Sequence, residues 1–259
     1  MRWMAVVCVL LLMAVGVGEK TDHFNVKYED MKYLSPGTGK VLEKAYEKVN
    51  GYMGTLPASI KVVVVDNDKM DKIGKQVEAF SAWNSQSSTI VLREETVKDK
   101  QSLPVVATHE ICHLALNKIL EDKDEDSYRW LEEGTSMVMS DEPLDDVKVS
   151  KYIVSHGYLN TTEIADAVDS KNYNVTKNGY LQSFSLCKYL VGKYGMQALV
   201  DIVKSPSVSF NDAFNKRTGT DFKTFYEDWT KDVQTVAAGK PNVQIVTIKG
   251  NLDLGMDEV

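Results

Sequence analysis

Cysteine is scarce in this sequence, with only three in 259 residues. A small scaffold held together by many disulfides is therefore excluded. Even without its apolar N-terminal residues 1–18, the chain has roughly 240 residues, which is enough to bury a full core without disulfides. Cys8 lies among those residues, so Cys112 and Cys187 are the pair to consider. Either a disulfide between them or two buried thiols that act as small apolar residues would suit an exported protein.

Positive charge is also in short supply. The chain has 30 Lys and Arg against 37 Asp and Glu, which gives a formal net charge of -7. An acidic balance of this size argues against nucleic acid or an anionic membrane as a partner. The sequence gives no indication of the oligomeric state.

The N-terminus predicts export. Arg2 is followed by an apolar stretch from Met4 to Val17, and polar residues begin at Glu19. This stretch is too short to span a bilayer comfortably, so residues 1–18 are interpreted as a signal peptide. We therefore expect a secreted or extracytoplasmic protein. The alternative is an uncleaved N-terminal anchor, which is the one membrane association that the sequence suggests.

The segment His109-Glu110-Ile111-Cys112-His113 carries the strongest chemical signal. Apolar residues at helical spacing predict a helix over 102–120, with Ser102 as its cap. Two histidines four residues apart then lie on one helix face and can reach a single metal ion. Glu110 projects into the same cleft, as a base rather than a ligand. Taken alone the motif is short, and a surface helix with two histidines would explain it equally well.

A second motif supplies a third ligand. A catalytic zinc takes three protein ligands and a water, so a further ligand is expected downstream. The sequence Trp-Leu-Glu-Glu-Gly at 130–134 lies in a helix predicted over 128–140, after a polar connection at 121–127. Glu133 is the preferred third ligand, and Glu132 is the competitor. The predicted cofactor is Zn²⁺.

Together, these two motifs resemble those of the gluzincin zinc metallopeptidases, specifically the compact peptidase MA-like domains. In that family the glutamate before the glycine is the third ligand, which implies Glu133. Between His113 and Glu133 lie 19 residues, one more than is usual in the related aminopeptidases. The resemblance runs from about His23 to Val233 and includes helices expected over 180–195, 209–214 and 220–229.

The resemblance implies an α+β zincin-like fold, in which a small N-terminal mixed sheet with an edge strand over the cleft precedes a mainly helical half. We expect the catalytic domain to span 19–236. Sequence patterns predict strands over 22–28, 59–65 and 89–92, a helix over 40–52 and a polar loop after residue 65. The strand at 89–92 is expected to border the cleft and to pair with an extended substrate. Residues 82–84, Ala-Trp-Asn, either line this approach or only shape a loop.

The C-terminal tail, residues 237–259, is separate from this domain. It contains a strand-like stretch at 243–248 and then an acidic end. The tail either adds an edge strand or lies in the cleft as an autoinhibitory segment, as in small gluzincins that it resembles.

The implied activity is hydrolysis of peptide bonds in a peptide or protein substrate by a zinc-activated water, with Glu110 as general base. Tyr180 is the candidate donor to the oxyanion and Tyr173 is the second choice, although both could be packing residues. Met137 stands where related enzymes carry an aspartate that orients a zinc ligand, so this partner must come from elsewhere. The alternative function is an exported gluzincin-fold binding or cell-surface domain with weak, absent or autoinhibited activity.

Overall fold

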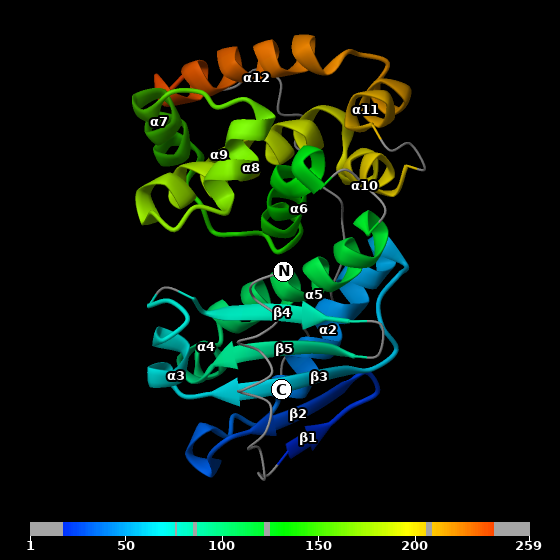
Figure 1. Ribbon diagram of the computed structural model, residues 1–259, viewed down its shortest axis with the longest axis vertical. Coiled ribbons are helices and arrows are strands. Elements are labelled where there is room, and N and C mark those ends of the chain that lie inside the picture. Colours follow the sequence, from blue (N-terminus) through cyan, green and yellow to red (C-terminus); the bar gives the residue numbers. More distant parts are fainter. Residues whose placement is uncertain (1–17, 76, 85–86, 122–124, 206–208, 241–259) are drawn as a thin grey trace, which may run out of the picture.

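The computed structural model describes residues 18–75, 77–84, 87–121, 125–205 and 209–240. The expected signal peptide, apart from Gly18, and the tail beyond residue 240 lie outside this part of the chain. Figure 1 shows a sheet flanked by helices in one half of the molecule and a bundle of helices in the other. The predicted order, a small mixed sheet followed by a mainly helical half, is confirmed.

The five strands form one sheet in the order β1-β2-β3-β5-β4. The central strands β2, β3 and β5 are parallel, and the two outer strands, β1 and β4, run antiparallel to their neighbours. The strands are β1 (Gly18–Lys20), β2 (Phe24–Tyr28), β3 (Ile60–Val65), β4 (Ala79–Trp83) and β5 (Ser88–Arg93). The helices of this half are η1 (Met31–Tyr33), α2 (Thr38–Met53), α3 (Asn67–Asp71), α4 (Glu94–Lys98) and α5 (Ser102–Leu120).

The prediction that the strand at 89–92 forms the exposed edge is wrong. This segment is β5, which lies between β3 and β4 and is hydrogen-bonded on both sides. The edge strand is β4, in the region predicted to be a polar loop, and α3 also lies there. Every residue of β4 is at least partly exposed, whereas β5 is buried from Ile90 to Arg93. A half-exposed strand of five residues carries a weaker hydrophobic signal than a strand buried on both faces.

In the middle of the sheet, β3 is buried on both faces. Along β3, Val62 and Val64 point into the main core with α2 and α5, while Val63 and Val65 pack against Met70 of α3 on the other side. The period of two along a strand sends successive side chains to opposite faces. Helix α5, on the same face as α2, packs against α6 of the helical half.

Helix α5 has the predicted limits, but its N-terminal cap differs from the expectation. Ser102 is the first residue of the helix. The Asp99 carboxylate accepts hydrogen bonds from the backbone N–H groups of Gln101 and Ser102 at 2.8 and 3.3 Å. Asp99 also accepts one from the Ser102 hydroxyl at 2.8 Å, so this carboxylate binds backbone donors where the helix begins.

The helical half consists of seven helices in the described residues. They are α6 (Glu125–Met139), α7 (Asp146–His156), α8 (Thr161–Val168), α9 (Tyr173–Tyr194), α10 (Met196–Lys204), α11 (Phe210–Thr218) and α12 (Phe222–Ala237). Helix α6 begins three residues earlier than predicted, and α9 begins seven earlier. An aromatic cluster joins α11 to α12, with the Phe214 and Phe225 rings 5.0 Å apart between centroids. None of the described helices has the length and hydropathy to cross a membrane.

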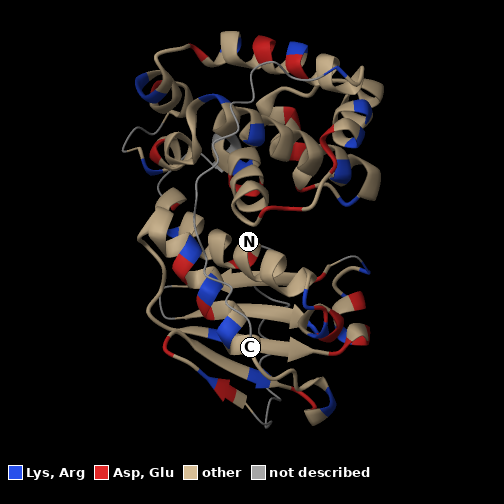
Figure 2. Cartoon of the chain, turned by 180° about the vertical axis from the view of Figure 1, so that it is seen from behind, with Lys and Arg blue, Asp and Glu red and all other residues tan. Residues whose placement is uncertain are grey.

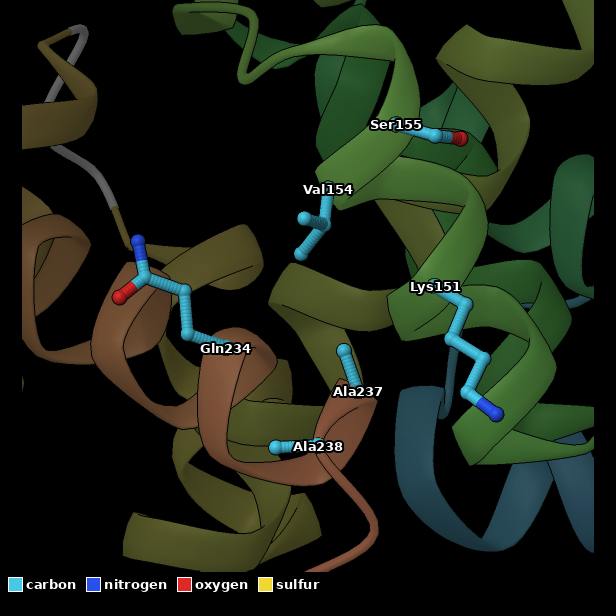
Figure 3. Close-up of a pocket in the computed structure, with 6 residues that line it drawn as sticks. All are labelled: Lys151, Val154, Ser155, Gln234, Ala237 and Ala238. Atoms are coloured by element: carbon cyan, nitrogen blue, oxygen red, sulfur yellow. The ribbon is translucent and has the colours of Figure 1, made fainter.

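Charged residues of both signs are interspersed over both halves in the view of Figure 2. An open hollow lies between α7 and α12, lined by the side chains that Figure 3 labels. The lining residues are Lys151, Val154, Ser155, Gln234, Ala237 and Ala238. None of the motif residues at 109–113 or 130–134 takes part in it, so this hollow does not belong to the site described below.

Helix α6 crosses α9 in close contact at Gly134. A methyl group on this glycine would overlap the backbone oxygen of Ser183 and the sulfur of Cys187. We expect Gly134→Ala to destabilise the protein by about 1–3 kcal/mol, because an overpacked crossing forces the two helices apart. Denaturant unfolding, followed by circular dichroism, measures this change.

Gly192→Ala in α9 is the matched control. This glycine is exposed within the helix, and a methyl group there would meet nothing within 4 Å. Alanine should therefore stabilise the helix by roughly 0.5–1 kcal/mol. Equal effects of the two substitutions would contradict the proposed contact at Gly134.

Candidate metal centre

His109 and His113 lie one turn apart on α5 and point the same way. Their Nε2 atoms are 3.0 Å apart. Ile111 and Ala115, on the opposite side of the helix, are fully buried in the main core. Because the core fixes that side, the two imidazoles are directed out of the sheet layer toward the helical half.

Glu133 of α6 brings a carboxylate to the same point. Its Oε2 lies 3.6 Å from Nε2 of His109 and 3.3 Å from Nε2 of His113. Only 3% of Glu133 is exposed, and this Oε2 has no hydrogen-bond partner among the described residues. Ligands about 2.1 Å from a tetrahedral metal ion lie roughly 3.4 Å apart, close to these separations. These residues could therefore hold a metal ion, and a bound metal would satisfy the buried oxygen.

Glu132 takes a different place. Its Oε1 lies 3.0 Å from Nδ1 of His113, on the side of the ring away from Glu133. Successive residues on a helix are rotated by about 100°, so the two neighbouring glutamates approach the same imidazole from different sides. A carboxylate on the second ring nitrogen fixes the tautomer and orientation of a metal-binding histidine. The structure thus brings Glu133, rather than Glu132, to the cluster.

His109 also faces a carboxylate with its Nδ1, at a longer distance and without a hydrogen bond. Oε1 of Glu142 lies 3.5 Å from its Nδ1. Just beyond α6, Asp141 adopts a left-handed conformation with φ of 55°, and the N–H of Glu142 bonds back to the carbonyl of Met137. This turn returns Glu142 toward α5. Glu132 and Glu142 are thus placed to serve the two histidines, in a chain that has Met137 where related enzymes carry an aspartate.

The electrostatics reflect this ring of carboxylates. Burial acts to lower the pKa of His109, but the nearby carboxylates of Glu133 and Glu142 outweigh it and raise this pKa to about 9. The pKa of His113 is also raised, because Glu133 and Glu132 outweigh its burial. For Glu133, burial acts to raise the pKa, but the charge of His113 and the close contacts with both histidines hold it well below its usual range. The site is therefore rich in negative charge that a cation would balance.

Arg129 ties the two glutamates together. Its Nη1 forms an ion pair with Oε1 of Glu133 at 2.8 Å and donates a hydrogen bond to Oε2 of Glu132 at 2.9 Å. Its Nε donates to Asp169, after α8, at 3.1 Å. The sequence did contain a signal for the first two contacts, since Arg129 precedes these glutamates by four and three residues on a predicted helix. Glu142 and Asp169 had no such signal, because their contacts depend on how the chain returns.

Glu110 is the only acidic residue of α5. It is 8% exposed, and its carboxylate has no hydrogen bond or ion pair with any described residue. Its charge acts on both His109 and Tyr180, raising the pKa of each. Glu110 is thus a nearly buried, unpaired carboxylate beside the cluster.

Of the two tyrosine candidates, Tyr180 is the one that interacts electrostatically with the cluster. The charge of Glu133, followed by burial, raises the pKa of Tyr180 well above its usual value, so the phenol keeps its proton. Tyr173 is 56% exposed at the start of α9. Tyr180 is therefore the one of the two that electrostatics couples to the acidic residues of the cluster.

Comparison of the sequence with known protein families agrees with a metal site of this kind. A sequence model of the peptidase MA superfamily matches residues 79–235, more than half of the chain. This chain belongs to the peptidase MA superfamily. The match begins at β4, includes the whole cluster and ends within α12. A search among curated proteins finds no match.

The two cysteines of this peptidase MA domain are free and buried. The disulfide that the sequence left open is therefore not formed. Burial raises the pKa of Cys112 to about 11, and it raises the pKa of Cys187 further. Both thiols act as small apolar side chains in the layer where α5, α6 and α9 meet.

The edge of the peptidase MA domain carries the segment 82–84. Ala82 and Trp83 belong to β4, and Trp83 is 48% exposed. Asn84 shapes the turn that follows, because its side-chain oxygen accepts a hydrogen bond from the N–H of Ser87 at 2.9 Å. Only Asn84 therefore shapes a loop, as one of the two expectations for this segment had it. Ala82 and Trp83 lie on the edge strand, and Asn84 holds the turn.

Proposed function

We propose that this chain is an exported zinc metallopeptidase that hydrolyses peptide bonds. The observation that carries the proposal is the convergence of His109, His113 and Glu133 beside the unpaired carboxylate of Glu110. Three protein ligands leave a coordination position open for water, as in catalytic rather than structural zinc sites. Membership of the peptidase MA superfamily, generally zinc-dependent, supports the same conclusion.

Zinc, when bound, supplies the Lewis acidity that activates water and polarises the scissile carbonyl. Glu110 takes the proton from the attacking water and returns it to the amine that leaves. Its carboxylate is free for this work, because no described side chain engages it. Tyr180 donates its O–H to the oxygen of the carbonyl as negative charge develops there. The raised pKa of Tyr180 supports this role, since only a protonated phenol can donate.

The substrate is a peptide or protein in extended conformation. Within the described part of the chain, no strand pairs with the outer edge of β4, and β4 packs against α5, the helix that carries the histidines. Pairing of backbone groups with such an edge holds a peptide with little regard to its side chains. Export is proposed from the apolar run that ends at Val17.

The test combines metal content with cleavage of an unstructured protein by the purified chain. We expect one equivalent of zinc, loss of cleavage when a chelator removes it, and recovery when zinc is restored. A zinc-loaded protein that cleaves nothing would favour a binding domain on the same fold. A protein that takes up no zinc would contradict the proposed site.

A further inference from the structure

We propose that Arg129 is a positioning residue for the metal centre. By engaging one oxygen of Glu133, it keeps the other directed at the two histidines, and it holds Glu132 against His113. This inference rests on the proposed function, because it concerns how the same site receives its metal.

The argument begins with the two oxygens of Glu133. Oε1 is taken by Arg129 at 2.8 Å, while Oε2 faces both imidazoles without a hydrogen-bond partner among the described residues. A carboxylate free to rotate could offer either oxygen or both to a metal ion. The bond to Arg129 leaves Oε2 alone for the metal and so protects the position that water needs.

The two carboxylate oxygens of Glu132 also have different partners. Its Oε1 meets the Nδ1 of His113, and its Oε2 accepts from the same Nη1 of Arg129. One guanidinium nitrogen therefore fixes both the ligand carboxylate and the carboxylate that orients a ligand histidine. The planar guanidinium group is held at its other end by Asp169, which lies outside α6. A lysine has neither the length nor the fork to make all three contacts.

The direction in which metal affinity changes when Arg129 is replaced distinguishes a positioning role from an effect of its charge alone. A cation beside a metal site repels the metal, so an arginine that acted by charge alone would weaken metal binding, and its removal would tighten it. An arginine that orients the ligands does the opposite. Loss of an orienting partner typically lowers metal affinity by about 10 to 100-fold.

The experiment uses the full chain with Arg129→Met and Arg129→Lys, compared with wild type. Zinc affinity is measured by competition with a chromophoric chelator, and folding by circular dichroism. The visible absorption of bound Co²⁺ reports the coordination number, because it loses intensity as ligands are added. Arg217→Met is the matched control, since Arg217 makes an exposed ion pair with Asp201 at 2.7 Å in the helical half.

We expect both Arg129 variants to bind zinc at least about 10-fold more weakly, with a weaker Co²⁺ spectrum, and Arg217→Met to match wild type. Unchanged or tighter binding in the Arg129 variants would overturn the inference while leaving the proposed function intact. If Arg129→Met does not fold, Arg129→Lys decides, because it keeps a cation beside the two glutamates. A wild-type chain that binds no metal would overturn the proposed function and this inference together.

Discussion

Glu110→Gln is expected to lower kcat/KM for peptide cleavage by roughly 10²–10⁴-fold, the range that a positioned general base contributes. Glutamine has nearly the same shape but cannot accept the proton of the attacking water. Glu110 has no hydrogen bond or ion pair with the described residues, so the substitution breaks no contact there. Metal content and the free energy of unfolding should therefore stay close to wild type. Initial rates on an unstructured protein, with zinc analysis of the same samples, measure both quantities.

Glu227→Gln is the control for the change in net charge. This residue is exposed on α12, far along the chain from the cluster. It removes one negative charge and should leave the rate unchanged. Cleavage by Glu110→Gln within about tenfold of wild type would show that another group takes the proton.

Glu133→Gln is expected to weaken zinc binding by more than about 100-fold, because loss of a direct ligand should exceed the 10 to 100-fold cost of losing an orienting partner. The amide is a poorer donor to zinc than the carboxylate, and it no longer balances Arg129 and the two histidines. Competition with a chromophoric chelator measures the dissociation constant.

Glu132→Gln provides the comparison for this experiment. Its carboxylate contacts the far nitrogen of His113, so we expect the smaller loss of about 10 to 100-fold. The two neighbours have the same chemistry and lie on the same helix, which makes the comparison direct. If the order of the two losses were reversed, Glu132 would be the ligand and the geometry of α6 would need revision.

The parts of the fold that the sequence predicted well are those with strong local patterns. The limits of α5 follow from an apolar run between polar segments, and β3 from a stretch of valines. The edge strand was missed because Ala79–Trp83 has few large apolar residues and is half exposed. The error over β5 has another cause. A buried pattern shows that a strand is covered, but it does not show which strand lies beside it.

At the site, the metal motif and its helix were predictable because two histidines four residues apart share a face on any helix. The choice between Glu132 and Glu133 depends on a rotation of about 100°, which spacing along the chain cannot fix when the connection varies in length. The contact between Glu142 and His109 could not be predicted from the sequence, because it depends on the left-handed turn at Asp141. Tyr180 rather than Tyr173 interacts with the charges of the cluster, since α9 begins at Tyr173 and leaves that side chain largely in solvent.

The crossing at Gly134 has a consequence for how such chains can diverge. The contact with α9 is one residue from Glu133, so the position of the ligand is set by this crossing and not by the connection that precedes α6. Insertions and deletions near residues 121–124 should then be tolerated without disturbing the cluster. A search pattern that requires a fixed interval between the second histidine and the glutamate would select Glu132 here, or pass over the chain altogether. The glycine that follows the ligand is a more dependable landmark than the interval.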